Sequence, residues 1–169
     1  MNKITAQVLY DEIREEDSRG GLYVWVDPDE ASVLQIQKLM HNAPFKTRNT
    51  TEYHSTVLFH EGELPHGVKP PIDRRTTATI TQLVLWDDEK GRKIVVAMLD
   101  SPDLQRLHAE LLGENLHHSF DDYNAHISVG KDVQMNAETR VWLEGRNEYL
   151  RVAPMEIRFD PRIKASALK

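Results

Sequence analysis

The chain contains no cysteine, which excludes disulfide bonds and thiolate metal sites. No apolar run approaches the roughly 18 residues that a membrane-spanning helix requires. The first residues, Met1 to Thr5, lack the apolar stretch of a secretory signal. These absences predict a cytoplasmic protein without a membrane partner.

An excess of positive charge is also missing, since the formal net charge is −6 at pH 7. Proteins that bind long nucleic acids usually present a broad basic surface, so the charge argues against such a partner. A small phosphate-bearing ligand stays possible, because it needs only a few donors in a pocket. With 40% hydrophobic and 28% charged residues, the 169-residue chain is typical of a globular protein, and we expect one domain over residues 1–169.

Hydrophobic periodicity, helix-start residues and turn residues predict a mixed order of strands and helices. The strands are expected at about 22–26, 52–59, 78–86, 92–99, 123–129 and 155–159. The helices are expected at 5–16, from Asp27-Pro28-Asp29 to about 40, from Ser101-Pro102-Asp103 to about 112, and at 136–148. In the third helix, Leu104, Leu107, Leu111 and Leu112 form the expected buried side. A Pro-rich loop at 61–76, a hairpin turn at 87–91 and a frayed tail at 162–169 complete the prediction.

This order contains a weak internal repeat, at about 22–59 and again at 93–129. Each copy has a strand, an Asp-Pro-Asp or Ser-Pro-Asp helix start, a helix, and a strand that carries a histidine. Pro28 precedes His54 by 26 positions, and Pro102 precedes His126 by 24. Two similar lobes that face each other would bring both histidine strands to one shared cleft.

Each histidine strand pairs an imidazole with a hydroxyl. Because side chains alternate between the faces of a strand, His54 shares a face with Thr56, and His126 shares one with Ser128. Two imidazoles can cleave a phosphodiester without a metal: one removes a proton from the attacking hydroxyl while the other protonates the leaving oxygen. The hydroxyls can stabilise the charge that develops on the phosphate oxygens.

The His-x-Ser/Thr pattern is weakly specific, because about one match is expected by chance and three occur. The third, His117-His118-Ser119, follows a helix end and lacks a strand pattern. A histidine on a strand can also be purely structural, and we assign no role to His41, His60, His66, His108, His117 and His118. Metal binding is the rival interpretation of a histidine-rich chain, but no His-Glu-x-x-His motif completes a site. We expect no metal and no cofactor.

These features resemble the two-histidine (2H) phosphoesterase superfamily, which is defined by paired His-x-Thr/Ser motifs on facing lobes. The chain is more closely similar to the phage anti-CBASS cyclic-oligonucleotide phosphodiesterases. The residues that carry this second resemblance are Gly21-Leu22-Tyr23-Val24, Asp27-Pro28-Asp29, Trp86 and Glu156, together with both histidine motifs. The resemblance covers about residues 20–160. It implies an α+β fold with two pseudo-symmetric lobes of antiparallel sheet, outer helices and a central cleft.

The resemblance also implies a function. The substrates would be cyclic di- or trinucleotide messengers of host immunity, linearised when a ribose 2′-hydroxyl attacks the adjacent 3′–5′ bond to leave 3′-phosphate ends. Tyr23 and Trp86 would stack on bases, and Glu156 would contact a base or ribose. A phage-encoded protein would act in the host cytoplasm.

Other interpretations of the same residues stay open. Tyr23 and Trp86 can be core aromatics, Glu156 can lie on a solvated strand face, and Arg74 and Arg75 can form either a phosphate-binding lid or an exposed basic turn. Two other functions also remain: a 2′,3′-cyclic phosphodiesterase that acts on linear RNA ends, and a non-catalytic nucleotide sponge.

Overall fold

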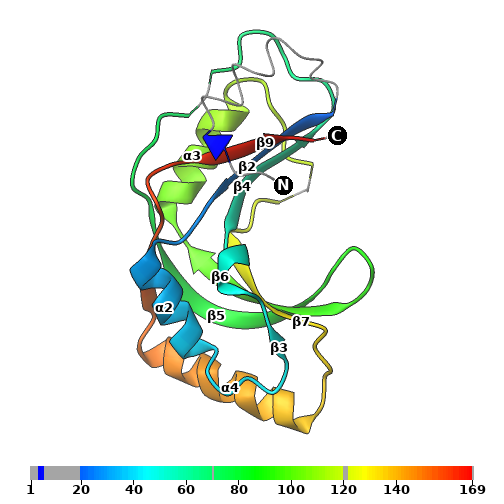
Figure 1. The fold of residues 1–169 in the computed structure, drawn as a ribbon, viewed down its shortest axis with the longest axis vertical. Coiled ribbons are helices and arrows are strands. Elements are labelled where there is room, and N and C mark those ends of the chain that lie inside the picture. The colour runs from blue at the N-terminus through cyan, green and yellow to red at the C-terminus, as the bar shows by residue number, and fades with distance from the viewer. Residues whose placement is uncertain (1–3, 6–19, 70, 120–121, 169) are drawn as a thin grey trace.

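Two antiparallel sheets that share a hydrophobic core organise the computed structural model, which describes residues 4–5, 20–69, 71–119 and 122–168. One sheet has the strand order β1-β9-β2-β4, and the other has the order β3-β7-β6-β5-β8. The strands are β1 (Ile4–Thr5), β2 (Gly21–Val26), β3 (Lys46–Thr47), β4 (Ser55–Glu61), β5 (Thr77–Asp87), β6 (Lys93–Asp100), β7 (His126–Lys131), β8 (Met155–Arg158) and β9 (Lys164–Ala167). In Figure 1 the first sheet occupies the upper half and the strongly curved second sheet the lower half. The predicted α+β fold with two antiparallel lobes is confirmed.

Each α-helix among the described residues begins at a side chain that accepts a hydrogen bond from the first turn. Asp29 accepts from the Ser32 N–H before α2 (Glu30–Leu39). Asn136 accepts from the Thr139 N–H before α4 (Ala137–Val152). Ser101 accepts from Leu104 at 3.1 Å, and Pro102 occupies the first position of α3 (Pro102–Leu112), where its missing N–H costs nothing. The two predicted Pro-Asp helix starts are therefore confirmed.

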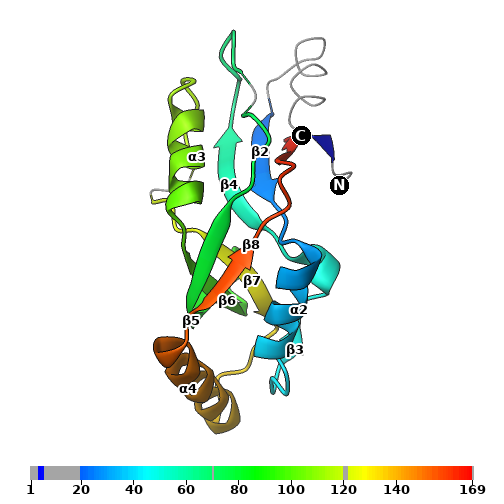
Figure 2. The same cartoon turned by 90° about the vertical axis from the view of Figure 1, so that its left-hand side faces the viewer.

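Two helices cross from one sheet to the other. Helix α2 follows β2 of the four-stranded sheet but packs against β8 of the five-stranded sheet, where Ser32 Oγ accepts a 2.7 Å bond from the Arg158 backbone. Helix α3 follows β6 of the five-stranded sheet but lies against β4, as Figure 2 shows, with its first turn at β5. Helix α4 covers the outer face of β5. The crossing ties the two lobes together.

The C-terminal tail, predicted to be frayed, instead forms a strand. Residues Lys164–Ala167 form β9, which pairs with β1 on one side and β2 on the other. Ile163 and Ala165 are fully buried. A short segment of mixed polarity carries no pattern of its own, so its pairing with distant strands decides its structure. Within the described residues, no helix has both the length and the apolar character that crossing a membrane requires.

Other differences from the sequence prediction are local. Leu112 is 39% exposed, so its expected burial is wrong; the buried side of α3 consists instead of Leu104, Leu107, His108 and Leu111. Strands β4 and β7 each begin three residues later than predicted, so His54 precedes β4 and His126 is the first residue of β7. The sequence did not indicate β3 or the short 3₁₀ helix η1 (Thr50–Glu52). The helix predicted at 5–16 lies, from residue 6 onward, outside the described residues.

Candidate active site

The two histidine strands lie where the sheets meet. Strand β4 is an edge strand of its sheet, and it contacts β7, the second strand of the other sheet. His54 stands immediately before β4 and His126 begins β7, so both imidazoles lie at the same junction. The effect of His54 on the pKa of His126, which it lowers, agrees with this placement.

Both imidazoles are held by the same local contact. His54 Nδ1 lies 2.7 Å from the carbonyl oxygen of Glu52, and His126 Nδ1 lies 2.7 Å from that of Asn124. A carbonyl only accepts, so Nδ1 carries the hydrogen in each ring and donates it to the residue two positions earlier. The tautomer is thereby fixed, and Nε2 is the nitrogen that can gain or lose a proton. This is the arrangement that acid–base catalysis by two imidazoles requires.

Burial sets the protonation of His126. It lowers the pKa of this imidazole below 6.5, because the half-buried ring loses the solvation of its charged form. The hydrogen bond to Asn124 acts in the opposite direction, and the positive charge of His54 lowers the pKa further. His126 is thus disposed to be neutral near pH 7.

Thr56 is held by an aromatic group on the same face of the four-stranded sheet. Its hydroxyl lies 3.0 Å from the hydroxyl of Tyr23. Burial raises the pKa of Tyr23, so the phenol stays protonated at neutral pH. The Tyr23 ring stacks on Trp25 at 4.9 Å and meets the edges of Phe59 and His54 at 6.0 and 6.2 Å. Tyr23 therefore supports the first histidine motif directly.

A β-bulge in β4 changes which residues share this face. Val24 pairs with Leu58 and Trp25 pairs with Thr56, so Val57 is the extra residue. Beyond it the alternation is reversed: Phe59 pairs with Tyr23 on the face that carries Thr56, whereas His60 pairs with Leu22 on the buried face. Strict alternation along the strand would place His60 on the face of His54 and Phe59 on the opposite face, and the bulge reverses both placements.

At the bulge, the consecutive carbonyls of Thr56 and Val57 accept hydrogen bonds from two stacked rings at the edge of β4 that pairs with no strand. The Tyr123 hydroxyl donates to Thr56 O at 3.0 Å, and His108 Nδ1 donates to Val57 O at 2.7 Å. The rings of His108 and Tyr123 are 4.1 Å apart and 11° from parallel. We call this pair the bulge clamp. It fixes the backbone at the first histidine motif from behind.

The rest of the β4 edge is covered by the segment that follows α3. Phe59 N donates to His118 Nδ1 at 3.2 Å, and Glu61 N donates to Ser119 Oγ at 3.0 Å. Only a neutral imidazole can accept, and burial, aided by the nearby His108 and His117, lowers the pKa of His118 to about 4. These contacts protect an edge strand that could otherwise pair with another chain.

The second motif lies on one face of the five-stranded sheet with two other predicted residues. Ser128 shares a strand face with His126, and the Trp86 ring meets the His126 ring at 4.5 Å. Glu156 pairs with Thr79, and Thr79 pairs with Asp100. Asp100 lies two positions from Met98, the partner of His126, so all these residues share one face of the sheet. Glu156 is exposed on this face. The structure thus brings Trp86, His126, Ser128 and Glu156 to one side of the sheet.

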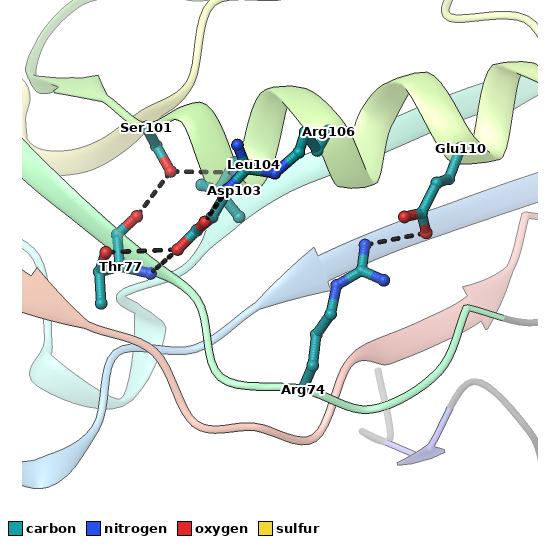
Figure 3. Close-up of polar contacts among 7 residues, drawn as sticks. All are labelled: Arg74, Thr77, Ser101, Asp103, Leu104, Arg106 and Glu110. Atoms are coloured by element: carbon teal, nitrogen blue, oxygen red, sulfur yellow. Dashed lines mark hydrogen bonds and ion pairs between the residues drawn. The ribbon is translucent and has the colours of Figure 1, made fainter.

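Arg74 lies outside this arrangement. Figure 3 shows its guanidinium turned toward α3, where it forms a 2.8 Å ion pair with Glu110. The neighbouring Asp103 accepts hydrogen bonds from Thr77 and Arg106. This favours the interpretation of Arg74 as part of a surface ion-pair network. Within the described residues, no three His, Asp or Glu side chains are grouped as a metal site would need.

Sequence reasoning missed the supporting residues. Trp25 carried a weak signal, since it lies two positions from Tyr23 on the same strand face. His108 and Tyr123 carried none, because they meet β4 from 51 and 67 positions away.

The fold and the site can be compared with known proteins. The structure resembles that of Escherichia coli LigT complexed with ATP, with a TM-score of 0.50 and 13% identity over 91% of this chain and 96% of that chain. The chain thus has the fold of LigT.

Sequence comparisons identify the family. The family described as anti-CBASS protein Acb1 matches residues 20–152. Anti-CBASS protein Acb1 of Vibrio phage KVP40 is 28% identical over 127 residues, which cover 72% of this chain and 82% of that protein. The protein of the same name from Salmonella phage S16 is 30% identical over 123 residues, 70% of this chain and 76% of that protein. The chain belongs to the anti-CBASS protein Acb1 family.

Proposed function

We propose that the protein is a metal-independent phosphodiesterase that linearises cyclic di- or trinucleotide messengers and so counters CBASS defence. The observation that carries this proposal is the matched pair of imidazoles. His54 and His126 lie at strands of different sheets, and Nδ1 of each donates to the carbonyl two residues earlier. In both rings, Nε2 is therefore the atom that can exchange a proton with the substrate. Membership of an anti-CBASS family supports a messenger as the substrate.

The reaction begins at a ribose. Nε2 of neutral His126 takes the proton of the 2′-hydroxyl, and this oxygen attacks the adjacent phosphorus. The bond from phosphorus to the 5′-oxygen breaks, and His54 gives the leaving oxygen a proton from Nε2. The lowered pKa of His126 is the reason to assign it the role of base. The product is a 2′,3′-cyclic phosphate.

Hydrolysis to a 3′-phosphate follows with the roles reversed. Protonated His126 now serves as the acid for the 2′-oxygen, and His54 activates a water molecule. Thr56 and Ser128 donate hydrogen bonds to the non-bridging phosphate oxygens in both steps. Because Tyr23 can donate to Thr56, it helps to orient that hydroxyl.

The bases of the messenger are held by the surrounding side chains. Trp86, which already borders His126, stacks on one base, and Glu156 accepts from a base or ribose. Tyr23 offers a second stacking surface at the other lobe. Since one stacking contact contributes about 1–3 kcal/mol, Trp86→Leu should raise KM by about five- to 150-fold. Trp142→Leu, on α4, where the ring packs against Phe45 and away from the proposed site, is the control for the loss of a tryptophan.

The test uses 3′,3′-cyclic GMP–AMP incubated with the protein, with and without EDTA, and products identified by mass spectrometry. Linear products that end in 3′-phosphate in both samples support the proposal. Cleavage confined to a linear RNA that ends in a 2′,3′-cyclic phosphate would refute the cyclic substrate. Intact nucleotide released on denaturation would show a sponge instead.

Variants test the two imidazoles. His54→Ala and His126→Ala should each lower turnover by about 10²–10⁴-fold. His66→Ala removes an exposed histidine from the 61–76 loop and should retain full activity. A double-alanine protein that still cleaves the messenger rules out this mechanism.

A further inference from the structure

A separate cavity of about 620 Å³ lies beside β3, η1, the end of α2 and the end of β7. None of the residues proposed for messenger cleavage lines it. Its charged lining residues are Lys46, Arg48, Glu52 and Lys131, so positive charge predominates in a protein with a formal net charge of −6. The hydroxyl residues Thr47 and Thr50 also line it. We call it the β3 cavity.

Two of its lysines face each other without a counter-charge. Lys46 and Lys131 are directly opposite in the antiparallel pair of β3 and β7, an arrangement that is unfavourable for like charges. Neither lysine forms an ion pair with any residue that the structure describes. An anion between them would remove the repulsion.

The third basic residue is only partly satisfied. Arg48 Nη1 lies 3.3 Å from Glu52 Oε2 in a partly exposed ion pair. Its Nε is buried and has no hydrogen-bond partner among the described residues. A buried N–H without an acceptor is unfavourable, and an anionic oxygen is the acceptor that a guanidinium prefers. Arg48 thus adds an incompletely hydrogen-bonded guanidinium to the lining of the cavity.

Comparison with a second basic cavity shows why these features matter. A cavity of about 260 Å³ between Arg74, Arg75 and Arg106 also gathers cations. There, however, Glu110 pairs with Arg74 and Asp103 pairs with Arg106 (Figure 3). Protein carboxylates thus pair with two of its three cations. The β3 cavity has one carboxylate for three cations, whereas the second cavity has two for three, so the β3 cavity has the larger excess of positive charge.

We propose that the β3 cavity is a second phosphate-binding site, which takes a phosphate or pyrophosphate group, free or at the end of a nucleotide. Lys46 and Lys131 supply the charge, Arg48 supplies planar donors, and the hydroxyls of Thr47 and Thr50 complete the set. Its volume is in the range of cavities that hold small ligands. The proposal does not depend on messenger cleavage, because the histidines take no part.

The site can be tested by NMR titration of the ¹⁵N-labelled protein with inorganic phosphate, pyrophosphate, a linear dinucleotide with a 3′-phosphate, and the same dinucleotide without it. Saturable shifts at the Thr47 and Gly130 amides with phosphate-bearing ligands support the site. Shifts with the dinucleotide that lacks the terminal phosphate, equal in size, would overturn it. Comparison of pyrophosphate with the phosphorylated dinucleotide shows whether the nucleoside contributes.

Charge-matched variants separate specific binding from general attraction. Lys46→Gln/Lys131→Gln should weaken pyrophosphate binding at least tenfold. Lys69→Gln/Lys90→Gln removes the same charge from exposed positions elsewhere and should leave affinity within twofold. Equal losses in the two double variants would refute the site, as would shifts confined to His54 and His126.

Discussion

The bulge clamp gives the sharpest test of how the first histidine motif is held. Tyr123→Phe removes one hydroxyl that donates to Thr56 O at 3.0 Å but keeps the ring that stacks on His108. The lost hydrogen bond and the unsatisfied carbonyl together should lower the free energy of unfolding by about 1.5 kcal/mol. For a domain of this size, that corresponds to a fall in Tm of about 3–6 °C.

Calorimetry and amide hydrogen exchange measure this effect. The exchange of the Phe59 and Glu61 amides, which bond to the segment following α3, should accelerate because the edge of β4 loosens. Tyr149→Phe is the matched control, since this side chain is 58% exposed on α4 and should change stability by less than about 0.5 kcal/mol. A Tyr123→Phe protein that unfolds within 1 °C of the parent, with unchanged exchange, would show that water replaces the hydroxyl and that the clamp contributes little.

Three further predictions concern protonation and packing. Because the pKa of His118 in the folded protein, about 4, lies below the usual 6.5, its contribution to stability is complete above about pH 6.5 and declines as the pH falls toward 4. Between pH 7 and pH 5, the free energy of unfolding measured in urea should fall by about 1 kcal/mol more for the parent than for His118→Asn, after allowance for screening at a partly exposed ring. An equal fall in both proteins would contradict this. His54→Gln removes a positive charge and should raise the pKa of His126 in an NMR titration of its ring, whereas an unchanged value would show that the imidazoles do not interact. Gly130→Ala places a Cβ 2.5 Å from the Phe45 ring and should cost about 1–3 kcal/mol, while Gly145→Ala, in open space on α4, should stabilise by up to about 1 kcal/mol; thermal unfolding that ranks the two variants in the opposite order would contradict the packing described.

The sequence predicted the elements that depend on local pattern. Asp29 and Ser101 marked the helix starts because a capping side chain acts within its own turn. The alternation around His126 also held, and Trp86 and Glu156 lie on the same face of the sheet as this histidine. These signals need no knowledge of distant residues.

The failures depend on long-range contacts. The bulge at Val57 exchanged the faces of Phe59 and His60, and a single extra residue is invisible to a periodicity of two. Strand β9 forms only because β1 and β2 flank it. The β3 cavity was also missed, since Lys46 and Lys131 stand 85 positions apart in the sequence and become neighbours only through strand pairing.

The exchange of helices between the lobes limits how the molecule can open. An outward rotation of one sheet would pull α2 from β8 and α3 from β4, and would expose side chains such as Ile36 and Leu107 that are now completely covered. A hinge opening of the two sheets is therefore disfavoured, and the packing of α2 and α3 across the sheets sets the spacing between the imidazoles. A ligand must therefore enter and leave through local movements of side chains and loops, without relative movement of the two sheets.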